Sequence, residues 1–136
     1  MDLVIDFPGG VRVDANFGPY TVATDQPPPG GAGAAPTPFS MFLAALGTCA
    51  GYYVLSFCQQ RHLPTQGLRL LQRVEFDSNT HLVSKVAFTI QLPPDFPEKY
   101  EAAITRAAER CKVSQQFEHP PQIEVSAALL ERAFAG

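Results

Sequence analysis

The stretch that decides the fold is FSMFLAALGTCAGYYVLSFCQQ, residues 39–60, which contains no charged residue. Pro38 precedes it, and proline fits the first turn of a helix, while Thr37 or Ser40 can supply the N-cap. We therefore expect a helix from Pro38 to about Arg61. Its apolar residues lie on every side, and such a helix must be covered on every side. One small sheet covers only one face, so the sequence favours a second layer from a second subunit.

This uncharged stretch is also long enough to span a bilayer, which needs about 20 residues. Several small or hydroxyl residues interrupt it, and no basic residue flanks its N-terminal side. The interrupting residues are Ser40, Gly47, Thr48, Gly51 and Ser56. The rest of the chain has the amphipathic patterns of a soluble domain. We therefore expect a buried helix and no membrane association.

The composition sets the class of protein. The chain has 136 residues, a length that fits a single domain over residues 1–136, and a net charge of −3. It has no cluster of Lys or Arg, which argues against nucleic acid and anionic membranes as partners. The N-terminus does not have the pattern of a secretory signal, and three widely spaced cysteines do not indicate a secreted disulfide framework. These features predict a cytoplasmic protein.

Short strands precede the uncharged stretch. Residues 11–17 alternate between apolar and polar, and residues 3–7 and 20–24 have similar patterns. Pro8, Gly9 and Gly10 provide a turn, so an antiparallel meander is expected. Residues 26–38 are too rich in Pro and Gly for regular structure and predict a long loop. Long ordered loops are often functional.

Two longer alternating strands follow, at residues 68–76 and 82–92, with turn residues 77–81 between them. Next, DFPEKYEAAITRAAERC, residues 95–111, has apolar residues at helical spacing, with Asp95 as the expected cap and Pro97 in the first turn. This spacing directs Cys111 toward the core. The remaining segments predict a short helix at 113–118, a strand at 122–127 and a helical tail at 129–135.

The three cysteines are the candidate reactive groups. Cys49 and Cys58 are nine residues apart on one predicted helix, which places them on roughly opposite sides and about 13.5 Å apart along the axis. A disulfide needs Cα atoms within about 7 Å, so a redox pair must include Cys111. The pattern leaves both Cys49–Cys111 and Cys58–Cys111 open. It also leaves open that each cysteine only fills space, the commonest role of a buried cysteine.

A reactive thiol needs a lowered pKa, which a nearby cation or a helix N-terminus provides. Cys49 lies too deep in its helix to use that helix's dipole. Arg12 is one possible source of a cation, and Arg110 and Lys112 flank Cys111. His62, His81 and His119 fall in different elements without ligand spacing, so no metal site and no cofactor are expected.

Three segments resemble one known family in order and in spacing. They are PTPFSMFLAALGTCAGYYV (36–54), LPPDFPEKY (92–100) and AAERCKVS (107–114), with the long alternating hairpin between the first two. Together they resemble the osmotically inducible protein C / organic hydroperoxide resistance family, and most closely its OsmC-like branch. The resemblance implies an OsmC-like α+β fold in an intertwined homodimer. Antiparallel sheets from both subunits would wrap around the central buried helices.

The resemblance also implies an enzyme, a thiol peroxidase active in oxidative-stress defence. Cys49 would be the peroxidatic thiol, attacking an organic hydroperoxide to give an alcohol and a sulfenic acid. Cys111 would be the resolving cysteine, and a dithiol reductant of lipoyl or thioredoxin-like type would restore both thiols. Arg12 would activate the Cys49 thiolate. The alternative is a non-catalytic dimer that binds an apolar small molecule at its interface.

Two positions depart from the family pattern. A glutamate that holds the activating arginine is found about ten positions before the first cysteine of the hydroperoxide-resistance members, and Phe39 occupies that position here. Lys112 follows the second cysteine, where proline is common. The cysteine pair therefore matches the family better than the residues expected to activate it.

Overall fold

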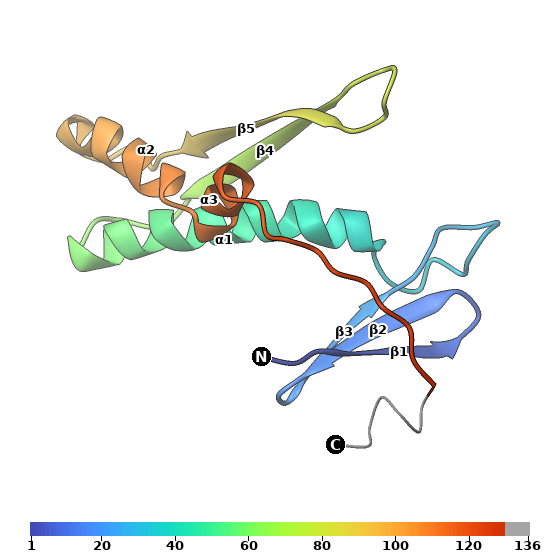
Figure 1. Ribbon diagram of the computed structural model, residues 1–136. Helices are drawn as coiled ribbons and strands as arrows, with labels where there is room; N and C mark the ends of the chain where they lie inside the picture. The colour runs from blue at the N-terminus through green and yellow to red at the C-terminus, as the bar shows by residue number, and fades with distance from the viewer. Residues whose placement is uncertain (130–136) are drawn as a thin grey trace.

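The computed structural model describes residues 1–129. Its first unit is an antiparallel sheet in the order β1-β2-β3, built from β1 (Val4–Gly9), β2 (Arg12–Phe17) and β3 (Tyr20–Thr24). The predicted meander is therefore confirmed. The turn glycine Gly10 adopts a positive φ of 57°, a conformation that glycine reaches without steric cost. This sheet lies apart from the other strands, near the N-terminal end of the long helix (Figure 1).

The predicted Pro- and Gly-rich loop is closed around one buried carboxylate. Asp25 is buried and accepts hydrogen bonds from the backbone N–H groups of Gln26, at 2.8 Å, and Ala34, at 3.0 Å. These bonds join the two ends of the loop. A Cβ at Gly31 would lie 2.3 Å from the carbonyl oxygen of Gln26, so only glycine fits at this position. The loop is thus an ordered structure and not a linker.

Helix α1 (Pro38–Gln60) has the predicted bounds. Thr37 is its N-cap and accepts a hydrogen bond from the backbone N–H of Ser40 at 3.1 Å. One face of α1 is buried, through Leu46, Ala50, Val54, Phe57 and Cys58. Large apolar residues on other faces are exposed, among them Tyr52 and Leu55. By length and composition α1 could cross a membrane, a test that core helices of soluble proteins also pass.

Strands β4 (Arg69–Phe76) and β5 (Val83–Gln91) form the predicted hairpin. A side chain ties it to the middle of α1, because Gln72 Nε2 donates to the carbonyl oxygen of Leu43 at 3.0 Å. Gly47 makes room for this contact, since a Cβ there would lie 2.2 Å from Gln72 Oε1. The absence of a side chain at Gly47 therefore lets the hairpin approach the helix.

The segment after β5 differs from its prediction at both ends. A 3-10 turn, η1 (Glu98–Tyr100), precedes α2 (Glu101–Glu109), and the N-cap of that turn is Pro97. The prediction of Asp95 as a cap was wrong, because residues 93–96 form a turn of their own, closed by a hydrogen bond from Phe96 N to Pro93 O. This turn places Phe96 in the core cluster with Val54, Phe57, Cys58 and Ile104.

Cys111 also lies outside the helix in which it was predicted. Helix α2 ends at Glu109, and Cys111 is the N-cap of α3 (Lys112–Glu118), close to the predicted short helix. The expected direction is nevertheless confirmed, because Cys111 is 0% exposed. The interruption between α2 and α3 turns Cys111 inward against α1.

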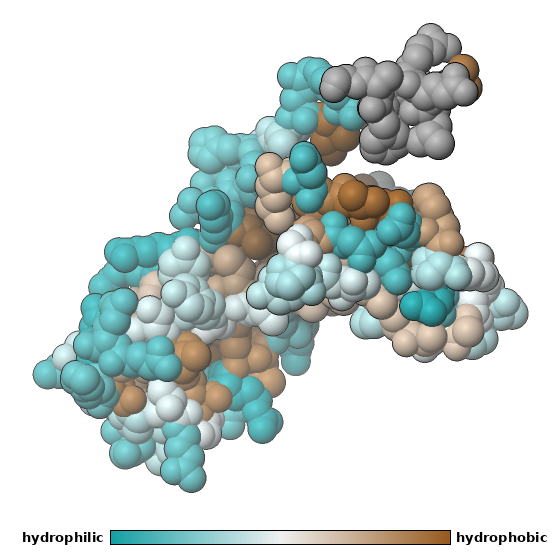
Figure 2. Space-filling model, turned by 90° about the horizontal axis from the view of Figure 1, so that it is seen from below, coloured by the Kyte–Doolittle hydropathy of each residue, from teal (hydrophilic) through white to brown (hydrophobic). Residues whose placement is uncertain are grey.

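The predicted strand at 122–127 is wrong for the single chain, since residues 120–129 form no regular element. The alternating pattern is present, but an isolated strand has no partner for its backbone groups. Ile123 and Val125 are accordingly 82% and 92% exposed. The predicted tail at 129–135 lies almost entirely outside the described residues. Patches of apolar side chains are visible on the surface (Figure 2).

Candidate active site

Cys49 and Cys111 meet on the buried side of α1. The Cys111 thiol lies 3.9 Å from the carbonyl oxygen of Leu46, to which it donates. The Cys49 side chain lies near enough to the Cys111 sulfur to lower the pKa of the Cys111 thiol. Leu46 and Cys49 are three residues apart and therefore neighbours on the helix surface. Of the two pairings that the sequence left open, the structure brings together Cys49 and Cys111.

The surroundings of Cys111 favour its thiolate. Burial by itself raises the pKa of this thiol, but hydrogen bonds from Cys49 and from the backbone and hydroxyl of Ser114 outweigh it. The backbone N–H of Val113 adds a smaller effect in the same direction, so the pKa lies below its ordinary value. Donors rather than a nearby cation therefore stabilise the charge.

The pKa of Cys58 is shifted in the opposite direction, to a higher value. Cys58 is as buried as Cys111, and burial raises its pKa, an effect that the guanidinium of Arg61 opposes only in part. Its neighbours are the apolar side chains of the core cluster. Cys58 therefore packs as a neutral thiol, consistent with the commonest role of a buried cysteine.

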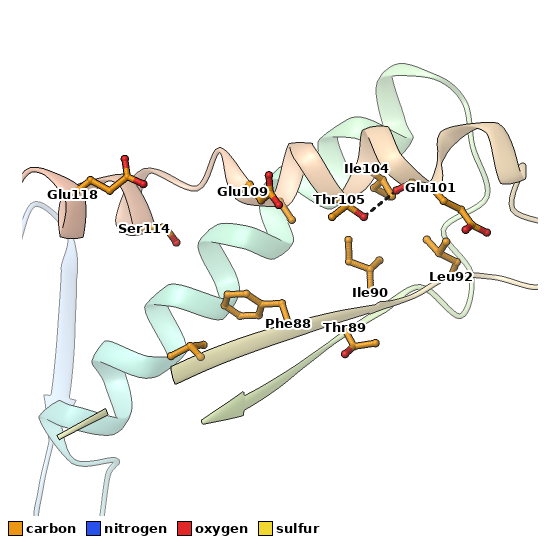
Figure 3. Close-up of a pocket in the computed structure, with 12 residues that line it drawn as sticks. Phe88, Thr89, Ile90, Leu92, Glu101, Ile104, Thr105, Glu109, Ser114 and Glu118 are labelled. Carbon is orange, nitrogen blue, oxygen red and sulfur yellow. Dashed lines mark hydrogen bonds between the residues drawn. The ribbon is translucent and has the colours of Figure 1, made fainter. Parts of the chain in front are cut away.

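A groove lined by both apolar and acidic side chains lies beside the Cys49–Cys111 pair, with Glu101, Glu109 and Glu118 among the residues that line it. Two cavities, of about 770 and 310 Å³, share Val86, Phe88 and Ser114 and together form this groove. Leu46, whose carbonyl oxygen accepts from Cys111, lines the smaller cavity. Figure 3 shows the larger cavity between β5 and helices α2 and α3, with Phe88, Ile90 and Leu92 on the strand side. The groove thus borders the residues that contact the thiol pair.

Arg12 is not brought to the thiols within one chain. It lies on β2 of the N-terminal sheet, where its Nη2 is 3.7 Å from Asp14 Oδ2. Its charge also lowers the pKa of Asp25, after the larger effects of the backbone hydrogen bonds from Ala34 and Gln26. The Arg12 Nε is buried and has no hydrogen-bond partner among the described residues. Arg12 is therefore grouped with the loop and not with Cys49.

Phe39 lies in an aromatic cluster at the start of α1. Its ring is 5.7 Å from that of Phe42 and 6.4 Å from that of Phe76, measured between centroids. Phe42 in turn packs edge-on against Phe117 of α3 at 5.6 Å. Phe39 occupies the position where the hydroperoxide-resistance members of the family carry a glutamate. Here that position is part of an apolar surface that continues into the smaller cavity.

Sequence reasoning missed Ser114, whose backbone and hydroxyl act to lower the pKa of Cys111. The signal was present in CKVS, residues 111–114, because an N-cap side chain and the residue three positions later approach each other at a helix start. It was overlooked because Cys111 was assigned to the preceding helix. The role of the Leu46 carbonyl was not detectable, since every helical residue has one.

Two neighbouring free cysteines beside a groove, on an α+β scaffold, are the candidate reactive groups of this protein. The chain belongs to the OsmC-like protein family, whose sequence profile matches residues 30–126. No curated protein matches the chain significantly.

Solved structures share this fold at low sequence identity. A protein of the osmotic stress induced and detoxification response from Psychrobacter arcticus is 18% identical, with a TM-score of 0.69 over 84% of this chain and 85% of that one. A hypothetical protein from Aquifex aeolicus is 11% identical, with a TM-score of 0.67 and 89% of each chain covered. The organic hydroperoxide resistance protein OsmC from Legionella pneumophila is 18% identical, with a TM-score of 0.53 over 86% of this chain and 89% of that one.

Proposed function

We propose that this protein is a thiol-dependent peroxidase that reduces organic hydroperoxides and acts in the oxidative-stress response. The observation that supports this most is the proximity of Cys49 and Cys111, next to a groove whose strand side is apolar. The Legionella pneumophila protein of the same fold is an organic hydroperoxide resistance protein. Family membership supports the same class of activity.

In the proposed reaction the Cys49 thiolate attacks the terminal oxygen of the hydroperoxide and breaks the O–O bond. The alkoxide takes up a proton and leaves as an alcohol, while Cys49 becomes a sulfenic acid. The Cys111 sulfur then attacks the Cys49 sulfur, an S–S bond forms, the S–O bond breaks and water leaves. A dithiol of lipoyl or thioredoxin-like type reduces the disulfide by thiol exchange and becomes a disulfide itself.

The groove supports an apolar substrate. Val86, Phe88, Ile90, Leu92 and Ile104 contribute apolar side chains to the larger cavity. Removing the alkyl part of a hydroperoxide from water provides binding free energy of about 25 cal/mol per Å² of buried apolar area. An alkyl or aryl hydroperoxide is therefore the substrate class that fits.

We further propose that the functional unit is an intertwined homodimer located in the cytoplasm. The chain has a mass of 14.8 kDa and exposes 10600 Å². A compact monomer of that mass exposes about 7,000 Å². The excess, about 3,600 Å² per chain, is larger than the roughly 1,000–2,500 Å² that each partner of an obligate homodimer buries. Sheets from both subunits would then cover the exposed faces of α1, and a second copy could bring its Arg12 to Cys49.

The test is peroxide consumption by the purified protein with cumene hydroperoxide and dihydrolipoamide. We expect turnover in the unmodified protein, loss of turnover in Cys49→Ser, and strong reduction in Cys111→Ser. Cys58→Ala is the matched control and should turn over normally, because Cys58 packs in the core. Unchanged turnover in Cys49→Ser would rule out the assigned nucleophile.

A non-catalytic dimer that binds an apolar small molecule is the second candidate, and the size of the groove favours it. A volume of about 770 Å³ lies within the range of small-molecule sites. This candidate predicts that one equivalent of hydroperoxide leaves all three thiols free. Mass mapping of a Cys49–Cys111 disulfide after that treatment would exclude it.

A further inference from the structure

We propose that the groove beside the cysteine pair accepts hydroperoxides whose organic group bears no negative charge and rejects those that carry a carboxylate. This inference rests on the proposed peroxidase function and narrows its substrate class. The larger cavity of the groove supports it, because apolar side chains line one side of that cavity and carboxylates line the other. Free fatty-acid hydroperoxides should therefore be poor substrates, and their esters good ones.

The strand side of the larger cavity is apolar because of the alternation along β5. Val86, Phe88 and Ile90 are two residues apart on this strand, so their side chains leave the same face of the hairpin. Leu92 follows just beyond the strand, and Ile104 of α2 contributes an apolar side chain from the helix side (Figure 3). An alkyl chain or aryl ring gains free energy when it is buried along this surface.

Three glutamates line the helix side of the same cavity (Figure 3). Glu101 and Glu109 are the first and last residues of α2, and Glu118 is the last residue of α3. The eight steps from Glu101 to Glu109 correspond to about 12 Å along the helix axis. A ligand carboxylate placed along α2 therefore lies no more than about 6 Å along the axis from one of them, less than the Debye length of about 8 Å at physiological ionic strength.

The charges of these glutamates are not neutralised by neighbouring cations. None of the three forms an ion pair with another of residues 1–129. No Lys, Arg or His is among the described residues that line the larger cavity. Lys85 lines the smaller cavity, but it lies opposite Glu75 in the pairing of β4 with β5, and cross-strand charges of opposite sign attract each other. The groove therefore presents an excess of negative charge to a ligand.

An apolar surface faced by unpaired carboxylates selects ligands by charge. An uncharged organic group gains from burial on the strand side, whereas a carboxylate in the cavity approaches one or more like charges. All three glutamates are exposed, so solvent and salt weaken this repulsion without removing it. The cavity should therefore distinguish a hydroperoxy acid from its ester, although both have the same chain.

The experiment measures kcat/KM of the full chain with dihydrolipoamide and two forms of one substrate, the hydroperoxide of linoleic acid and its methyl ester, both below the concentrations at which they form micelles. At low salt the ester should be used about 10-fold more efficiently than the acid, and added NaCl should reduce this ratio, because the two differ by one charge. An amide of the same acid that carries a quaternary ammonium group should be used at least as well as the ester. Rejection of this cationic amide would overturn the inference, since it would show selection against polarity and not against negative charge.

A glutamine variant tests whether the three carboxylates cause the selection. Combining Glu101→Gln, Glu109→Gln and Glu118→Gln should bring kcat/KM for the acid close to that for the ester, an increase of about 10-fold relative to the ester. The matched control removes the same charge from exposed positions that do not line the groove and should keep the preference for the ester. It combines Asp2→Asn, Asp95→Asn and Glu98→Gln.

The outcomes separate this inference from the proposed function. Equal use of acid and ester by the unmodified protein, or a preference that persists in the glutamine variant, would overturn the inference alone. Absence of turnover with both the ester and cumene hydroperoxide would overturn the proposed function. Charge selection is then measured by binding, as displacement of Nile red by laurate and by methyl laurate. Stronger displacement by methyl laurate that is lost in the glutamine variant would support the inference, and the same preference in both proteins would overturn it.

Discussion

Two buried cysteines of this chain have opposite acid–base properties because their neighbours differ. Cys111 and Cys58 are both 0% exposed. Hydrogen-bond donors at the start of α3 and on Cys49 lower the pKa of Cys111, whereas an apolar environment raises that of Cys58. Burial alone therefore does not decide whether a thiol is reactive. The donors around the sulfur decide it.

This difference predicts how Cys58 affects stability at alkaline pH. The folded-state pKa of Cys58 is raised above the ordinary value of 9.0, so the unfolded chain releases this proton at a lower pH than the folded protein does. The free energy of unfolding should therefore fall as the pH rises above about 9, by at most about 1.4 kcal/mol per pH unit. Cys58→Ala should lack this contribution.

The measurement is urea unfolding of both proteins at pH 7, 8, 9 and 10. Below pH 8 the difference between them should be constant and should reflect packing alone. Above pH 9 the unmodified protein should lose stability faster than Cys58→Ala. Parallel pH curves would contradict the assignment of Cys58 as a buried neutral thiol.

At the scale of elements, the contact between β4 and α1 depends on one glycine. Gly47→Ala should by itself stabilise the helix by about 1 kcal/mol. However, the new Cβ would displace the Gln72 amide and break its hydrogen bond to Leu43, which costs about 0.5–1.5 kcal/mol. We therefore expect almost no net change in the free energy of unfolding.

A double-mutant cycle tests this balance. In a Gln72→Ala background no amide remains to be displaced, so Gly47→Ala should stabilise the protein by about 1 kcal/mol. The expected coupling between the two positions is therefore about 1 kcal/mol, measurable by urea unfolding. Additive effects would show that Gln72 does not hold the hairpin to the helix.

Elements whose patterns are local were predictable from the sequence. The bounds of α1, the β4–β5 hairpin and the N-terminal meander follow from capping residues, alternation and turn residues. Asp95 failed as a cap because the turn that buries Phe96 is a tertiary effect. Residue spacing alone left the candidate site as three cysteines with two possible pairs, because the pairing depends on the interruption between α2 and α3 at Cys111; only the family resemblance named Cys49 and Cys111. Ser114 was missed for the same reason.

At the scale of the whole molecule, the exposed apolar side of α1 predicts self-association. Leu55 is 41% exposed in the single chain. Leu55→Lys should therefore cost little in a monomer, but it would place a charge inside a dimer interface without a partner. Sedimentation should give about twice 14.8 kDa for the unmodified protein and a large shift toward 14.8 kDa for Leu55→Lys. Gln66→Lys, in an exposed loop, is the control with the same added charge and should remain dimeric.

The segment after α3 should belong to the same assembly. Residues 120–129 carry the alternation of a strand but pair with no strand among residues 1–129. A sheet edge of a second copy would supply the missing backbone hydrogen bonds. The outcome of the Leu55→Lys experiment also bears on this segment, because a monomer should leave it accessible to protease whereas a dimer should protect it.

The core of the single chain is small, so the stability of the protein should depend on its concentration. Only eight apolar residues are buried in the described part of the chain. The burial of apolar surface within one copy therefore offsets only part of the conformational entropy lost on folding. When much of the stabilising contact lies between copies, stability depends on protein concentration and not on sequence alone. Dilution would then act as a denaturant. A cell that makes more of this protein would also make each molecule of it longer-lived.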